Sequence, residues 1–185
     1  KWAANNLSRE GVPDNLIKIT GNTVVDALLI ESKAQEDGAV QRQLGAYFSK
    51  ALGFDWRSEP FVLITGHRRE NFGKGFEQIC EALSVLADRF NNARFVYPVH
   101  LNPSVKCVVE QRLANRPNIF LLEPLPYRPF VALMKYAGLI LTDSGGVQEE
   151  APRFGTPVLV MRETTERPEG IEAGVAHLVG ANCSS

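Results

Sequence analysis

The sequence has no excess of charge of either sign and no long hydrophobic run. It carries 20 lysines and arginines against 21 aspartates and glutamates, so the formal net charge of the 185 residues is −1. Proteins that hold a nucleic-acid backbone present a basic surplus, which is missing here. No apolar stretch reaches the roughly 20 residues of a transmembrane helix, and no signal peptide opens the chain. These absences predict a cytoplasmic protein that binds neither nucleic acid nor a membrane.

Cysteine is scarce, and the motifs of metal and cofactor sites are missing. The three cysteines, Cys80, Cys107 and Cys183, are odd in number and lack metal-ligand spacing. Reduced thiols in a cytosolic protein explain them most simply. There is no His-x-Glu-x-His motif and no CxxC pair, and neither a Gly-x-Gly-x-x-Gly fingerprint nor a P-loop lysine occurs. We therefore expect no metal site and no nicotinamide or ATP site.

What the sequence does contain is a regular alternation of short apolar runs and helical patterns from Pro60 onward. Hydrophobic residues make up 44% of the chain, and its length suffices for one α/β domain with a substantial core. Alternation at short spacing predicts a parallel sheet with helices on both faces. The expected strands are 61–65, 94–97, 119–122, 139–142, 157–160 and 177–179, and the expected helices are 76–90, 104–114, 127–136 and 147–154.

The first 58 residues follow a different pattern. The expected elements are a helix over 2–10, a short strand over 16–20 and an apolar helix over 24–34. Asn22 or Thr23 would cap the last of these helices. Residues 35–58 are rich in polar side chains and weakly periodic, which indicates a solvated helical connector that ends near Gly53.

We therefore divide the chain into a helical connector, residues 1–58, and an α/β domain, residues 59–185. The first residue is Lys1, and the helical pattern is already under way at Trp2. Residues 181–185 are small and polar, with no helix after them to close the sheet. These features predict a piece of a longer chain, cut at both ends.

The stretch that says most about function begins with the apolar run 139–142, which ends in Asp-Ser-Gly-Gly and leads into a helical pattern. Gly145 and Gly146 leave the backbone amides uncovered, and a helix N-terminus attracts anions. Ser144 can add a hydroxyl donor, and Glu150, four residues after Gly146, lies on the same helix face. A carboxylate there suits sugar hydroxyls, so the stretch predicts a nucleoside diphosphate. The alternative is an ordinary strand–helix connection with Asp143 or Ser144 as N-cap.

Basic side chains follow two other expected strands at their carboxyl ends. His67 and Arg68 come directly after strand 61–65, and His100 follows strand 94–97. Open α/β sheets bind their ligands at this edge. Arginine suits phosphate, and histidine can donate to phosphate or carry a proton. The alternatives are a charged surface loop at 66–73 and a structural role for His100.

Two further stretches bring candidate ligand contacts. Arg162 and Arg167 follow strand 157–160 and add anion-binding groups to the same edge. Phe130, after a proline-rich loop, can pack against a nucleobase or belong to the core. The sequence leaves both roles of Phe130 open.

Five motifs together resemble the non-hydrolysing bacterial UDP-N-acetylglucosamine 2-epimerases. They are Thr-Gly-Asn-Thr-Val-Val-Asp-Ala at 20–27, Gly-His-Arg-Arg-Glu-Asn at 66–71, Tyr-Pro-Val-His-Leu-Asn-Pro at 97–103, Thr-Asp-Ser-Gly-Gly-Val-Gln-Glu-Glu at 142–150 and Arg-Glu-Thr-Thr-Glu-Arg-Pro at 162–168. The resemblance covers nearly the whole chain, in order. It implies the second domain of a glycosyltransferase-B type fold, Rossmann-like and three-layered, together with the connector from a first domain that is missing. The closing C-terminal helices also look absent.

The resemblance implies a role for each site residue. The diphosphate would rest on Ser144, Gly145 and Gly146, the ribose on Glu150, and the phosphates or the sugar on Arg167. By the same resemblance, Phe130 flanks the uracil, His67 serves catalysis beside the leaving diphosphate, and Arg68 and His100 belong to an activating site for a second UDP-GlcNAc.

The implied reaction interconverts UDP-GlcNAc and UDP-ManNAc by eliminating and re-adding UDP, without a cofactor. Positive groups stabilise the leaving diphosphate, whereas the acid/base carboxylates lie on the first domain in this family. The chain alone is therefore expected to be inactive. The family also implies a cytoplasmic homodimer that serves cell-envelope polysaccharide synthesis. Alternatives are a UDP-sugar glycosyltransferase, a non-catalytic sugar-nucleotide sensor, or a hydrolysing epimerase that releases ManNAc and UDP.

Overall fold

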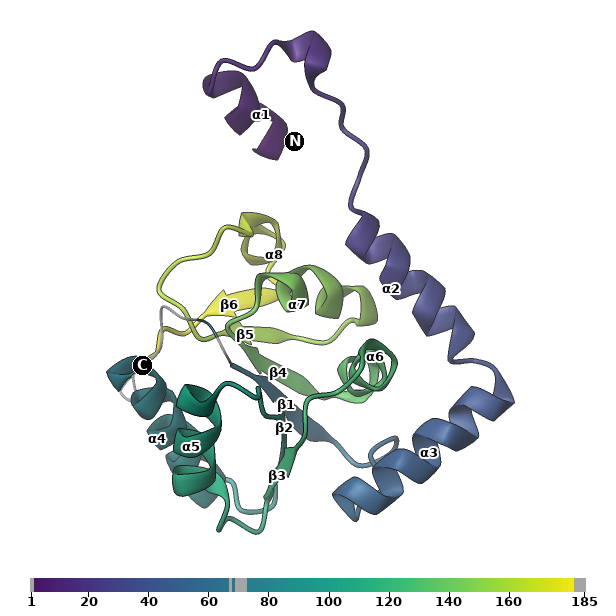
Figure 1. Cartoon of the computed structure of the whole chain (residues 1–185), viewed down its shortest axis with the longest axis vertical. Helices are drawn as coiled ribbons and strands as arrows, with labels where there is room; N and C mark the ends of the chain where they lie inside the picture. Colours follow the sequence, from purple (N-terminus) through teal and green to yellow (C-terminus); the bar gives the residue numbers. More distant parts are fainter. Residues whose placement is uncertain (1, 67, 69–72, 182–185) are drawn as a thin grey trace.

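The computed structural model describes residues 2–66, 68 and 73–181, and contains one parallel sheet (Figure 1). Its six strands run in the order β3-β2-β1-β4-β5-β6. They are β1 Phe61–Thr65, β2 Arg94–Pro98, β3 Ile119–Leu122, β4 Leu139–Thr142, β5 Val158–Val160 and β6 Ala176–Leu178. All the strands expected from Pro60 onward are therefore confirmed, with β6 beginning one residue earlier than predicted.

Helices cover both faces of this sheet, as the alternating pattern predicted (Figure 1). Those that follow the strands are α4 Lys74–Arg89, α5 Pro103–Leu113, α6 Tyr127–Tyr136, α7 Gly145–Glu150 with the 3-10 turn η3 Ala151–Phe154, and α8 Pro168–Glu172. Those that precede the sheet are α1 Trp2–Arg9, the 3-10 turn η1 Asp14–Leu16, α2 Thr23–Ala34 and α3 Gly38–Leu52.

Successive strand residues serve two separate cores. Leu63 belongs to the cluster on the side of α2, α3 and α6, whereas its neighbour Ile64 belongs to the cluster on the side of α4 and α5. Both side chains are completely buried. Because side chains alternate between the faces of a strand, a sheet covered on both sides needs apolar residues at every position. The three-layer α/β architecture is thus confirmed.

The strand order reverses between β1 and β4, which lie side by side at the centre of the sheet. Thr65 at the end of β1 is in register with Thr142 at the end of β4. In Rossmann-like sheets of this order, ligands bind beyond the carboxyl ends of the strands at this reversal. The loops that begin at Gly66 and Asp143 therefore flank the expected binding crevice.

Residues 35–58 contain a helix that ends at Leu52, next to Gly53, as predicted, but the expectation that this segment is only solvated is wrong. Leu44, Phe48 and Leu52 of α3, followed by Trp56, are buried against the sheet. The ring centroids of Phe48 and Trp56 lie 4.7 Å apart. Leu44, Phe48 and Leu52 are spaced by four, which places them on one stripe of α3, but polar residues and glycine between them mask this stripe in the sequence. The domain boundary at residue 58 stays a prediction.

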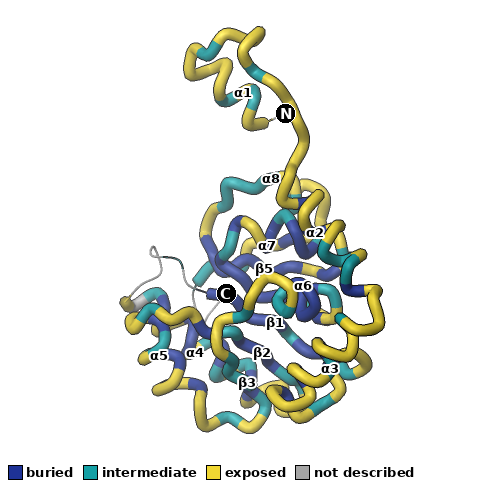
Figure 2. Tube along the Cα trace, turned by 45° about the vertical axis from the view of Figure 1, so that its right-hand side comes forward, coloured by how far each residue is buried: buried dark blue, intermediate teal, exposed yellow. Residues whose placement is uncertain are grey.

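The short strand expected over 16–20 is also wrong. The chain there forms the turn η1 and an extended segment, and Leu16 and Ile19 are each 69% exposed. A strand needs a neighbour for its backbone hydrogen bonds, and this arm projects away from the sheet (Figure 2). The arm ends at Asn22, whose side-chain oxygen accepts a hydrogen bond from Val24 N at 3.0 Å. Asn22 is therefore the cap of α2, which the sequence had left open between two residues.

Candidate functional site

Two hydrogen bonds join the loops on either side of the strand-order reversal. The hydroxyls of Thr65 and Thr142 lie 2.5 Å apart. The backbone N–H of Arg68 donates to Oδ2 of Asp143 at 2.9 Å, and the Asp143 side chain is completely buried. The loop after β1 is thus held against the loop after β4, and the two present a single surface at the carboxyl edge of the sheet.

The start of α7 lacks the side-chain cap that the ordinary connection would supply. Ser144 occupies the N-cap position, but its hydroxyl makes no capping hydrogen bond within the described chain. Asp143, the other candidate cap, instead accepts from the backbone of Arg68. The first amides of a helix have no partner inside the helix. The turn at Gly145 and Gly146 therefore offers backbone donors at the crevice.

The two glycines of this turn have different surroundings. Gly146 is exposed, and a Cβ added to it would have Ser144 Oγ, at 3.8 Å, as its nearest neighbour. Gly145 is buried, and a Cβ there would lie 3.0 Å from Oε1 of Glu166. A side chain at this position would require the Glu166 carboxylate to shift by a few tenths of an ångström. The corner is consequently open at Gly146 and occupied by a carboxylate beside Gly145.

Glu166 is held by two arginines. Its Oε1 accepts a hydrogen bond from Arg68 at 2.7 Å, and its Oε2 accepts one from Arg162 at 2.6 Å. Partial burial by itself would raise the pKa of the Glu166 carboxyl. Hydrogen bonds from Arg162, from its own backbone N–H and from Arg68 outweigh burial and lower the pKa to about 2. The site therefore contains an ionised carboxylate between two guanidinium groups.

The Glu166 contacts predict a dependence of stability on pH. The pKa of Glu166 falls from 4.5 to about 2 on folding, so its contribution is complete above pH 4.5 and is lost as the pH falls towards 2. We expect the difference in free energy of unfolding between the wild type and Glu166→Gln to shrink when the pH is lowered from about 6 to about 3, as measured by urea denaturation. A difference that stays constant over this range would contradict the assignment.

Glu150 is buried on the next turn of α7, with only 7% of its surface exposed. Its Oε1 accepts a hydrogen bond from the Tyr127 hydroxyl at 3.0 Å. Burial and the nearby Glu149 raise the pKa of the Glu150 carboxyl, while the Tyr127 hydrogen bond acts in the opposite direction. Tyr127 thus fixes the orientation of Glu150 and stabilises its ionised form.

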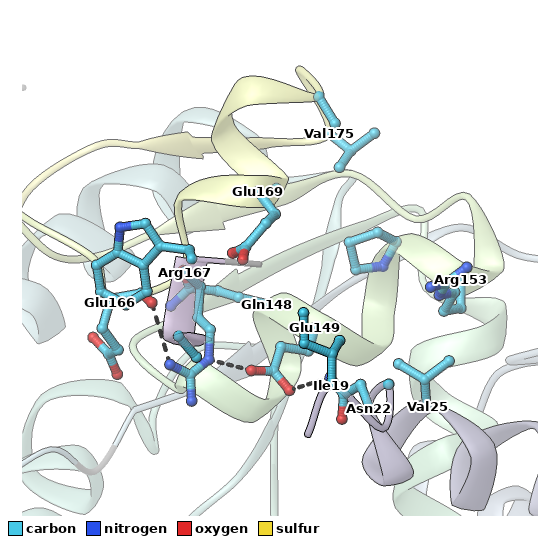
Figure 3. A pocket seen from close by; sticks show the side chains of 16 residues that line it. Ile19, Asn22, Val25, Gln148, Glu149, Arg153, Glu166, Arg167, Glu169 and Val175 are labelled. Carbon is cyan, nitrogen blue, oxygen red and sulfur yellow. Dashed lines mark hydrogen bonds and ion pairs between the residues drawn. The ribbon is translucent and has the colours of Figure 1, made fainter. Parts of the chain in front are cut away.

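A cavity of about 810 Å³ adjoins this corner and is shown in Figure 3. Arg167 lines it and forms an ion pair with Glu149, the residue before Glu150. Oε2 of Glu149 accepts a hydrogen bond from Nδ2 of Asn22 at 2.8 Å. Residues that precede α2, among them Ile19, also line the cavity. Glu149 therefore contacts both Asn22, the cap of α2, and Arg167, a predicted ligand-binding residue.

His100 and Phe130, two further predicted site residues, lie at the same sheet edge or beside it. His100 follows β2, is exposed, and accepts a hydrogen bond at Nδ1 from the N–H of Asn102. Phe130 on α6 is partly buried and packs against the core on that face, so the structure supports a packing role without testing a base contact. His67, the predicted catalytic residue, lies outside the described residues. The individual site assignments stay predictions.

Reasoning from sequence missed three side chains that the structure brings into the site. Glu166 pairs with Arg162 four residues earlier, but the segment between them is not helical, so this spacing gave no signal in the sequence. Glu149 and Tyr127 meet their partners only through contacts between separate elements, which no local pattern reports. Across the described residues, no cluster of side chains suited to a metal ion occurs, and no helix is long and apolar enough to span a membrane.

The whole chain, residues 1–185, matches the sequence profile of the family described as UDP-N-acetylglucosamine 2-epimerase. The UDP-N-acetylglucosamine 2-epimerase of Salmonella typhimurium is 51% identical over 178 residues, which cover 96% of this chain and 46% of that protein. The Campylobacter jejuni protein of the same name is 50% identical over 183 residues, covering 97% and 47%. The chain spans about half the length of the curated relatives it matches.

Solved structures agree with this assignment. UDP-GlcNAc 2-epimerase from Neisseria meningitidis bound to UDP-GlcNAc superposes with a TM-score of 0.92 at 42% identity, over 98% of this chain and 48% of that one. The Methanocaldococcus jannaschii enzyme in complex with UDP-GlcNAc and UDP gives 0.85 at 35% identity, over 98% and 49%. The predicted resemblance is confirmed: this chain belongs to the UDP-N-acetylglucosamine 2-epimerase family.

Proposed function

We propose that the chain is the UDP-binding half of an enzyme that interconverts UDP-GlcNAc and UDP-ManNAc. The observation that carries this proposal is the turn at Ser144–Gly146, which no side chain of the described residues caps and which is exposed at Gly146. It lies at the strand-order reversal beside arginine side chains. Backbone amides at such a turn suit a diphosphate. The solved relatives named above, bound to UDP-GlcNAc or to UDP, support the choice of ligand.

In this proposal the diphosphate rests against Ser144, Gly145 and Gly146. Glu150 accepts hydrogen bonds from the ribose hydroxyls, because Tyr127 holds its carboxylate in one orientation. Arg167 turns from Glu149 to the phosphates or to the sugar. Phe130 flanks the uracil at the edge of its core packing.

Catalysis proceeds by elimination of UDP and its re-addition to the glycal that remains bound. Positive charge at this site stabilises the UDP anion as the C1–O bond breaks, and His67 is proposed to stand beside that leaving group. The carboxylates that move the C2 proton belong to the other half of the enzyme. This chain by itself is therefore expected to bind UDP without turning over UDP-GlcNAc.

Further properties of the parent protein belong to the same proposal. Arg68 and His100 follow the neighbouring strands β1 and β2, so we assign them to the activating UDP-GlcNAc site that the family resemblance implies. The parent would act as a cytoplasmic homodimer and supply UDP-ManNAc for cell-envelope polysaccharides. It would need no metal and no cofactor.

Two incubations with UDP-GlcNAc, followed by proton NMR, test the function. The full-length parent should produce UDP-ManNAc without an acceptor, and this chain alone should produce none. Free ManNAc with UDP would indicate a hydrolysing epimerase, and transfer to an added acceptor would indicate a glycosyltransferase. Turnover by this chain alone would contradict the assignment of the acid/base carboxylates to the other half of the enzyme. Tight UDP-GlcNAc binding by the parent without any turnover would indicate a sensor.

A further inference from the structure

The carboxylate of Glu166 lies in the place where the site can best hold an anion. Its two oxygens are each bonded to a different arginine, Arg68 after β1 and Arg162 after β5. Arginine forks bind carboxylate and phosphate by the same kind of charge-assisted hydrogen bond. The same pair of guanidinium groups can therefore hold either the Glu166 carboxylate or a phosphate.

Glu166 also touches the turn on which a diphosphate would rest. A Cβ on Gly145 would come within 3.0 Å of Glu166 Oε1 and within 3.5 Å of a terminal nitrogen of Arg68. The carboxylate therefore occupies the space into which a side chain at Gly145 would extend. A phosphate seated against Gly145 and the carboxylate in its present position would repel each other.

The Glu166 side chain can leave without unfolding its loop. The neighbouring Thr165 is anchored to α7, because its hydroxyl donates to Oε1 of Gln148 at 2.7 Å and accepts from the N–H of Arg167. The Glu166 side chain is half-buried, with 36% of its surface exposed. A swing of this side chain towards solvent would thus break its hydrogen bonds to both arginines and leave the backbone in place.

We propose that Glu166 is a built-in competing anion, which occupies the phosphate subsite when no ligand is bound and which the diphosphate of the nucleotide must displace. The inference rests on the proposed function and adds a determinant of specificity to it. It also gives Arg68 a contact with the diphosphate, in addition to its assignment to the activating site. An anion with a single charge would merely replace the carboxylate at equal charge. A diphosphate carries more charge and more oxygens, so it can outcompete Glu166 at both arginines.

The test compares the wild type with Glu166→Gln, which keeps the size of the side chain and removes its charge. Isothermal titration calorimetry with UDP and with inorganic pyrophosphate should show binding about threefold to tenfold tighter for the variant, the range expected when a partly exposed pair of ion pairs no longer competes. Uridine, which has no phosphate, should bind both proteins equally, as measured by NMR titration. Glu166→Asp, which keeps the charge, should not reproduce the gain.

Glu169→Gln is the matched control, because Glu169 is an exposed glutamate three residues further on that lines the same cavity. Weaker or unchanged pyrophosphate binding by Glu166→Gln would overturn the inference and make Glu166 a positioning residue for the arginines. An equal gain in Glu169→Gln would also overturn it, since the effect would then be one of overall charge. Failure of every protein, wild type included, to bind UDP would instead reject the proposed function.

A measurement on the wild type needs no variant. Saturation with pyrophosphate should move the Glu166 carboxylate carbon resonance in NMR spectra, because the carboxylate leaves both arginines. A resonance that does not move while pyrophosphate binds would overturn the inference and leave the proposed function standing.

Discussion

Replacing Gly146 by valine is expected to weaken UDP binding by about a hundredfold or more while the chain remains folded. Gly146 is exposed and a Cβ there meets its nearest neighbour at 3.8 Å, so the fold has room for a side chain. The diphosphate has no such room if it rests on the backbone of this turn. Losing two charge-assisted hydrogen bonds, each worth about 1.5–3 kcal/mol, gives an effect of this size.

Calorimetry with UDP measures the loss of binding, and a thermal unfolding curve shows whether the variant remains folded. Gly38→Val is the matched control, because Gly38 is an exposed glycine in the first turn of α3, where a Cβ meets only the end of the flexible Arg42 side chain. The control should bind UDP like the wild type. Unchanged UDP affinity in Gly146→Val would remove the turn at 144–146 from the binding site and with it the basis of the proposed function.

Replacing Phe48 by alanine is expected to lower the free energy of unfolding by about 3–5 kcal/mol, the usual cost of removing a buried phenylalanine. Phe48 is completely buried in the core cluster that includes Leu63 of β1, and its ring packs on Trp56. The loss has two parts: the free energy gained by burying the ring, which alanine lacks, and the cost of the cavity left under α3. Urea denaturation followed by circular dichroism measures it.

Phe90→Ala provides the comparison, because it makes the same chemical change at a phenylalanine that is 50% exposed at the end of α4. We expect it to cost less than about 1 kcal/mol. Similar losses in the two variants would show that α3 is no part of the cooperative unit.

The strands and most helices were predictable because their signals are local. Buried strands such as β1 and β4 appear as short apolar runs between turn residues. Such a run indicates burial from its own residue types, without knowledge of which elements pack against it. The failures occurred where the deciding contact is distant in the chain. Leu16 lies in a 3-10 turn, and no strand of the described residues pairs with it. Phe48 is buried because the sheet face needs a cover.

The candidate site was likewise predictable only where its signal is local. Ser144, Gly145 and Gly146 were found from sequence, because a turn that exposes amides after a strand needs small residues at consecutive positions. The carboxylate of Glu166 beside Gly145 was not found, since residues 21 apart in the chain meet there only through the packing of β5 against β4. The hydrogen bond from Asn22 to Glu149 joins residues 127 apart in the chain, and no sequence pattern indicates it.

By itself, then, the sequence determined the α/β class, the parallel strands, the glycine turn and the family resemblance, all of which depend on residue type and short-range spacing. Only the tertiary structure decided the strand order, which places the loops after Thr65 and Thr142 side by side. It alone decided which charges pair across the crevice, because ion pairs such as Arg68 with Glu166 depend on distances in space. Spacing along the chain does not determine those distances.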